Sequence, residues 1–72
     1  MEILKKYYSI DKKNIGFLKF IFEAYEGIAV VTTTGKEKNK IVLRIAMGFE
    51  DDVDMVLDDL NRRIMISEIK DL

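Results

Sequence analysis

Residues 9–28, SIDKKNIGFLKFIFEAYEGI, decide the fold, because they contain the end of a strand, a helix and the start of another strand. The apolar residues of this stretch recur at spacings of three and four, which predicts an amphipathic helix over residues 14–26: Ile15, Leu18, Ile21, Phe22 and Tyr25. Gly27 stands where a left-handed C-terminal cap belongs. Asp11 and Asn14 are both candidate N-terminal caps, since each has a side-chain acceptor.

Strands are predicted on both sides of this helix. Residues 3–10 alternate loosely and contain paired tyrosines, which favours a strand. Residues 28–34, IAVVTTT, are rich in β-branched side chains and predict a second strand. Residues 35–40, GKEKNK, have the composition of a turn, and residues 41–46 alternate cleanly. The strands at residues 28–34 and 41–46 are therefore expected to form a hairpin.

A second helix is predicted over residues 49–64. Its apolar stripe consists of Val53, Val56, Leu57, Leu60 and Ile64. Acids lie at its start, and Arg62 and Arg63 are expected in its last turn, an order that complements the helix dipole. Residues 65–70, MISEIK, predict a short final strand.

The element order is thus βαββαβ, which predicts a single α+β domain over residues 1–72. We expect a ferredoxin-like two-layer sandwich, with two helices on one face of an antiparallel four-stranded sheet of strand order 4-1-3-2. The predicted core consists of Leu4, Tyr8, Ile10, Leu18, Ile21, Phe22, Ile28, Val30, Ile41, Leu43, Ile45, Val53, Val56, Leu57 and Leu60.

Composition restricts the function. The chain has 72 residues, 49% of them hydrophobic, a net charge of −1, and neither cysteine nor histidine. Disulfides and thiolate metal sites are therefore excluded. No apolar run is long enough to cross a membrane, so a cytoplasmic protein is expected. The neutral charge balance gives no general attraction to nucleic acid, and nucleic-acid binding is not expected.

Catalysis is not expected either, because the commonest nucleophiles, bases and zinc ligands are missing. The acids Glu50, Asp51, Asp52 and Asp54 resemble a hard-cation cluster in composition, but their spacing is not that of a calcium loop. Acids at a helix N-terminus also have a sufficient structural reason. We therefore predict neither a metal site nor a cofactor.

Two families resemble the chain. The run FLKFIFEAYEGIAVVTT, a basic turn, the strand IVLRI and the acidic helix resemble the domain of unknown function 4911 family of very short bacterial proteins. That resemblance implies a stand-alone domain without an assigned activity. More distantly, the chain is similar to ACT-like regulatory domains, which place Asp or Asn and a Gly after the first strand, commonly with Pro before the Gly. Asp11, Asn14 and Gly16 match this pattern loosely, while Ile15 occupies the proline position.

The ACT-like resemblance implies a site for a small, amino-acid-like ligand at Asp11, Asn14, Ile15 and Gly16. Helix-start N–H groups in such a loop can hold a carboxylate. A packed helix start without a ligand is the competing interpretation of the same residues. Two functions follow: an ACT-like ligand-binding or regulatory module, and a homo-oligomeric protein–protein interaction domain without a small ligand.

A homodimer is predicted from the strand at residues 28–34, an edge strand that contains no proline, lysine or glutamate to protect it. Pairing of this edge with a second copy would place Val31 and Thr33 at the interface. Phe17 and Phe20, which lie off the core stripe of the first helix, are expected beside them.

Overall fold

The computed structural model describes residues 3–25, 27–34 and 39–70. Its elements are β1 (Ile3–Ile10), the 3₁₀-helix η1 (Lys12–Asn14), α1 (Ile15–Ala24), β2 (Ala29–Thr33), β3 (Lys40–Ala46), α2 (Glu50–Leu60) and β4 (Ile66–Ile69). The predicted order βαββαβ is confirmed, with η1 as an added turn before α1. The predicted turn at residues 35–40 lies largely outside the described residues.

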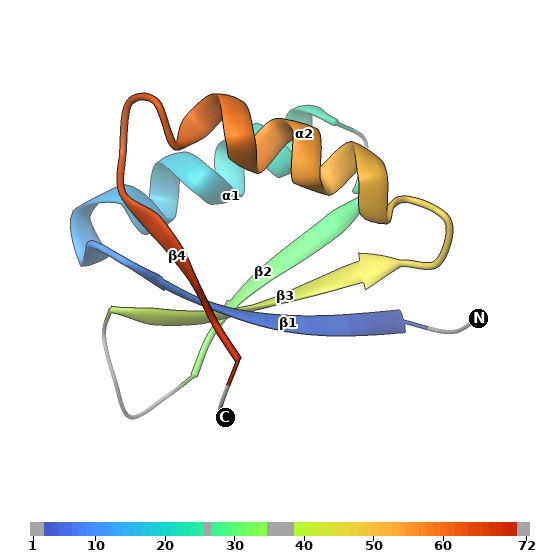
Figure 1. Cartoon of the computed structure of the whole chain (residues 1–72), viewed down its shortest axis with the longest axis horizontal. Helices are drawn as coiled ribbons and strands as arrows, with labels where there is room; N and C mark the ends of the chain where they lie inside the picture. The colour runs from blue at the N-terminus through green and yellow to red at the C-terminus, as the bar shows by residue number, and fades with distance from the viewer. Residues whose placement is uncertain (1–2, 26, 35–38, 71–72) are drawn as a thin grey trace.

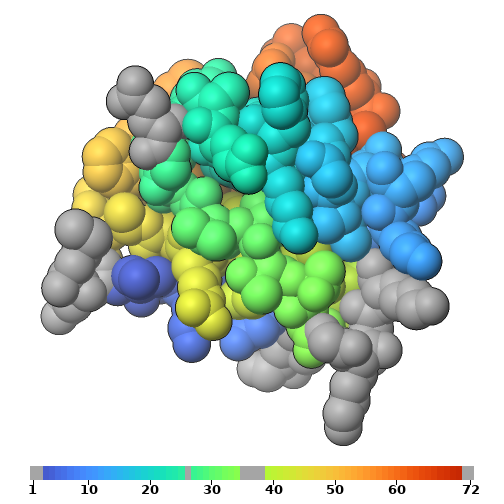
Figure 2. All heavy atoms as spheres, turned by 180° about the vertical axis from the view of Figure 1, so that it is seen from behind, coloured from blue at the N-terminus to red at the C-terminus, as the bar shows by residue number. Residues whose placement is uncertain are grey.

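The four strands form one antiparallel sheet in the order β2-β3-β1-β4, as predicted. Tyr8 pairs with Ile41 of β3 on one side and with Glu68 of β4 on the other. Both helices lie on the same face of the sheet, and no described element covers the opposite face (Figure 1). This is the ferredoxin-like α+β arrangement. Seen from behind, the edge strand β2 lies below α1 (Figure 2).

The two ends of α1 follow from the side chains around them. The carboxylate of Asp11 accepts a hydrogen bond from the backbone N–H of Lys13 at 3.2 Å, so Asp11 caps η1, whereas Asn14 makes no side-chain cap hydrogen bond. α1 ends at Ala24, earlier than predicted. Gly27 follows with a φ of 76° and donates to the carbonyl of Phe22 at 3.3 Å, which confirms the predicted glycine after the helix.

Side chains at both ends of α2 bond to the neighbouring backbone. Glu50 accepts a hydrogen bond at 2.8 Å from the N–H of Gly48, whose φ is 95°. Asn61 Oδ1 accepts from the N–H of Ile66 at 3.1 Å and so ties the end of α2 to β4. The placement of Arg62 and Arg63 in the last helical turn is wrong, because α2 ends at Leu60 and both arginines follow it.

Most of the predicted core is confirmed. The buried residues are Tyr8, Ile10, Ile15, Leu18, Phe22, Ala29, Val31, Ile41, Val42, Leu43, Ile45, Val53, Val56, Leu57, Leu60 and Ile66. Val30 was predicted inside but is 57% exposed, because Val31 rather than Val30 pairs with the buried Leu43. Leu4 lies opposite the buried Ile45, yet it stays 37% exposed.

Candidate functional site

A groove between α1 and α2 is the strongest candidate site. It has a volume of about 580 Å³. Its lining residues come from both helices and from the segments that connect them to the sheet: Ile21, Tyr25, Ile28, Phe49, Asp52, Met55, Val56, Asp59 and Leu60. We call this feature the groove.

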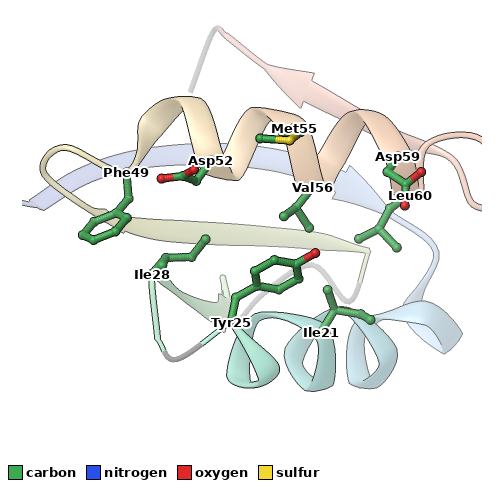
Figure 3. Close-up of a pocket in the computed structure, with 9 residues that line it drawn as sticks. All are labelled: Ile21, Tyr25, Ile28, Phe49, Asp52, Met55, Val56, Asp59 and Leu60. Carbon is green, nitrogen blue, oxygen red and sulfur yellow. The ribbon is translucent and has the colours of Figure 1, made fainter.

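The groove exists because each helix packs on the sheet through its own apolar stripe. Leu18 and Phe22 attach α1, and Val53 attaches α2, all three being almost fully buried. Ile21 then extends from α1 toward α2, and Val56 extends back toward α1 (Figure 3). The side chains that face one another across this gap do not close it.

The groove is apolar inside and carries polar groups at a few defined points. Phe49 and Ile28 lie at one end, and Tyr25 extends its ring and hydroxyl toward α2 (Figure 3). Asp52 and Asp59 lie on the α2 side, near opposite ends (Figure 3). An apolar concavity with a few oriented polar groups is the usual composition of a small-molecule site.

The sequence did not identify this groove. The sequence pattern places Tyr25 in the apolar stripe of the first helix, and it predicts no role for Met55 or Phe49. Met55 is 65% exposed on a helix whose buried stripe holds other residues, and Phe49 precedes the helix. The signal that the sequence offers for the groove is the presence of large apolar residues outside the core stripe. Whether such residues lie opposite α1 depends on the distance between the two helices, which the sequence pattern does not give.

Of the four predicted ligand residues, Asp11 lines a described hollow. This hollow has a volume of about 490 Å³, and Asp11 lines it together with Ser9, Ile10, Lys12, Asn39, Met65 and Ser67. Asn14, Ile15 and Gly16 do not line it. Ile15 is buried in the core, whereas Gly16 is exposed within α1, where a Cβ atom would meet nothing within 4 Å. Gly16 therefore serves no close backbone approach among the described residues.

The residues predicted for a dimer interface lie on α1 and on β2 and differ in exposure. Phe17 and Phe20 are exposed on α1, and Phe20 is 64% exposed. Thr33 is exposed near the end of β2. The side chain of Val31, in contrast, is buried in the core.

A smaller hollow of about 180 Å³ lies beside Tyr8, between α2 and β4. Burial raises the pKa of Tyr8 to about 12, and the carboxylates of Glu68 and Asp54 contribute to this increase. A tyrosine that holds its proton so strongly is a poor base or nucleophile at neutral pH. Lys6 of β1 lies 3.9 Å from Asp54, a contact that partly balances the charge of α2.

In residues 3–25, 27–34 and 39–70, no group of three or more acidic side chains is arranged to hold a metal ion. Within the same ranges, neither helix has the length and apolar composition needed to cross a bilayer.

Comparison with known proteins gives one match. Residues 8–64 match the model of a family described as a domain of unknown function, DUF4911. Comparisons with curated proteins and with solved structures gave no significant match.

Proposed function

We propose that this chain, which belongs to the DUF4911 family of unknown function, is a non-catalytic binding module. Its ligand site is the groove between α1 and α2, and its ligand is a small, mainly apolar molecule. The observation that carries this proposal is the groove itself, whose apolar side chains are incompletely covered.

The size and lining of the groove support this proposal. Its volume of about 580 Å³ lies within the range of about 300–1,000 Å³ that is usual for ligand sites. Tyr25 is 52% exposed, and covering an apolar surface of this kind stabilises a complex by about 25 cal/mol per Å². A ligand in the groove therefore gains from burial without displacing any fully buried side chain.

A binding role also fits the chemistry of the chain. The sequence has no histidine and no cysteine, and the only described group whose pKa is clearly shifted, that of Tyr8, moves away from neutrality. A regulatory or carrier role requires affinity and selectivity but no nucleophile or base. Such a module acts through the occupancy of its site.

A thermal-shift screen of small molecules tests the proposal. A ligand that binds only the folded state stabilises it by about 2.7 kcal/mol at a free concentration of about 100 Kd, which raises the Tm of a domain of this size by roughly 10–20 °C. The matched variants are Met55→Trp, which adds bulk at the groove, and Met47→Trp, which adds it at an exposed methionine outside. The proposal requires shifts that Met55→Trp removes and Met47→Trp retains; equal shifts in both variants would contradict it.

A homo-oligomeric interaction domain is the second candidate, and the exposed edge of β2 favours it. Among the described strands, β2 lies at the edge of the sheet and pairs with β3, and its five residues, AVVTT, include no charge or proline. Val30 is exposed on this strand, and Phe17 and Phe20 are exposed on α1, which lies above it (Figure 2). An edge of this kind can pair with its own copy across a two-fold axis.

Light scattering at micromolar concentration separates the two candidates. A dimer gives twice the chain mass of 8.4 kDa. The substitution Val30→Lys places a charge on β2 and should dissociate a dimer that uses this edge. Ser67→Lys, at an exposed position on the opposite edge strand, is the control. A monomer in wild-type solution would exclude the second candidate.

A further inference from the structure

The charges around the groove indicate the chemistry of its ligand, an inference that rests on the function proposed above. We propose that the groove binds an organic cation, a molecule with an apolar body and an amine or quaternary ammonium group. The body lies between the helices, and the positive group lies beside a carboxylate of α2.

The first step of the argument is the sign of the charge. Of the nine described residues that line the groove, Asp52 and Asp59 are the two that carry a formal charge, and both are acidic. They are seven residues apart on α2, which places them on the same side of the helix and about 10 Å apart along its axis. A negative potential therefore extends along one wall of an apolar groove.

The second step is that neither carboxylate forms a salt bridge with a described residue. Among the described residues, the lysine that approaches α2 is Lys6, and it contacts Asp54, which does not line the groove. Neither Asp52 nor Asp59 has a cationic side-chain nitrogen within 4 Å in the described part of the chain. A ligand with a positive group would supply the missing counter-charge.

The third step is the aromatic surface of the groove. Phe49 lies at the same end of the groove as Asp52, whereas Tyr25 lies near the middle of the groove, below Val56 (Figure 3). Aromatic ring faces attract ammonium groups and also cover apolar chains. The Asp52 end therefore favours a cation through the carboxylate of Asp52 and the ring of Phe49, and the ring of Tyr25 covers the apolar body of the ligand.

The same arrangement disfavours anions. A fatty acid, or the carboxylate of a free amino acid, would lie beside Asp52 or Asp59 and be repelled. Selectivity for charge thus comes from rejection of anions as much as from attraction of cations. An uncharged molecule of the same shape would bind through the apolar lining alone.

Three probes with the same eight-carbon chain isolate the charge: octylamine, octanol and octanoate, each titrated calorimetrically into the whole protein at low salt. We expect octylamine to bind most tightly and octanoate least tightly. Because exposed charge pairs contribute modestly, Asp52→Asn or Asp59→Asn should each weaken octylamine by about 2- to 5-fold and leave octanol unchanged. Asp51→Asn removes an acid of α2 that does not line the groove and should change neither.

The outcomes separate the inference from the function beneath it. Equal affinities for octylamine and octanol, or equal effects of Asp52→Asn and Asp51→Asn, would overturn the inference and leave the groove as a site for neutral molecules. The inference also fails if octylamine does not bind while another screened compound binds and is blocked by Met55→Trp. If no compound of any charge binds in a manner sensitive to Met55→Trp, the proposed function fails together with the inference.

Discussion

The space between the helices and the sheet differs sharply from the space between the two helices. We call the first region the interior. In the interior, Leu18, Phe22 and Val53 are at most 1% exposed. In the groove, Tyr25 is 52% exposed and Met55 is 65% exposed, although the same two helices supply them. The helices are thus held to the sheet and not closed against each other.

This difference separates stability from binding within a very small domain. Apolar side chains in the interior lose nearly all contact with water on folding, so they carry most of the hydrophobic stabilisation. In the groove, Tyr25, Phe49 and Met55 keep much of their exposure and contribute less to it, whereas Val56 and Leu60 line the groove and are also buried in the core. The exposed part of the lining can therefore change, or take up a ligand, with little effect on the fold.

Two adjacent residues of α1 give the largest expected contrast. Phe22→Ala, in the interior, should lower the free energy of unfolding by about 3–5 kcal/mol, through lost burial and a residual cavity. Ile21→Ala, in the groove, should cost about 1 kcal/mol, because its side chain is only partly buried. Urea denaturation measures both values. If Ile21→Ala were as costly as Phe22→Ala, the groove would be part of the interior and the distinction would be wrong.

The two neighbouring valines of β2 test which side of the strand belongs to the interior. Val31→Lys should cost about 3 kcal/mol or more, because it places a charge in the core. Val30→Lys should change the stability of the monomer by no more than about 0.5 kcal/mol, because Val30 is exposed. Thermal unfolding followed by circular dichroism measures both. The reverse order would mean that β2 is shifted by one residue in its register.

The pH dependence of the free energy of unfolding should show whether Tyr8, beneath α2, belongs to the interior. The folded-state pKa of Tyr8 is raised to about 12 from an ordinary value of about 10. Tyr8 therefore contributes fully to stability below pH 10, and the contribution is lost as the pH rises toward 12, because the unfolded chain releases this proton first. The loss should amount to about 2 kcal/mol.

Urea denaturation between pH 9 and pH 11.5 measures this loss in the wild type and in Tyr8→Phe. The variant should lose less stability than the wild type over this interval, and Tyr7→Phe serves as the matched control. Identical pH profiles for the wild type and Tyr8→Phe would show that Tyr8 is hydrated and lies outside the interior.

The smallest expected effects concern the two ends of α1, outside both regions. Gly16→Ala should raise stability by about 0.5 kcal/mol, because alanine is the better helix former and a Cβ atom at this position meets open space. Gly27→Ala should lower stability by about 1 kcal/mol, because the φ of Gly27 is positive. Calorimetric Tm values compare the two. A destabilising Gly16→Ala would indicate a constraint on Gly16 beyond the helix, as a ligand loop would impose.

Sequence patterns predicted the interior well and the groove not at all. The stripes through Leu18 and Val53 have helical spacing, which is the signal that predicts the buried face of a helix. The groove depends on how far apart the helices lie once each has packed on the sheet. No periodicity within a single helix reports that distance, so Phe49, Met55 and Tyr25 were not recognised as neighbours.

By itself, the sequence determined the order of elements, the strand order, the glycine after α1 and most of the core, because these depend on local periodicity and on few allowed topologies. It did not decide between Val30 and Val31, because two adjacent β-branched residues satisfy either phase of a strand. Pairing with Leu43 of β3 decided it. Tertiary structure alone also brought Asp52 and Asp59 of α2 into one groove with Tyr25, which follows α1, since only packing on a common sheet places two helix flanks face to face.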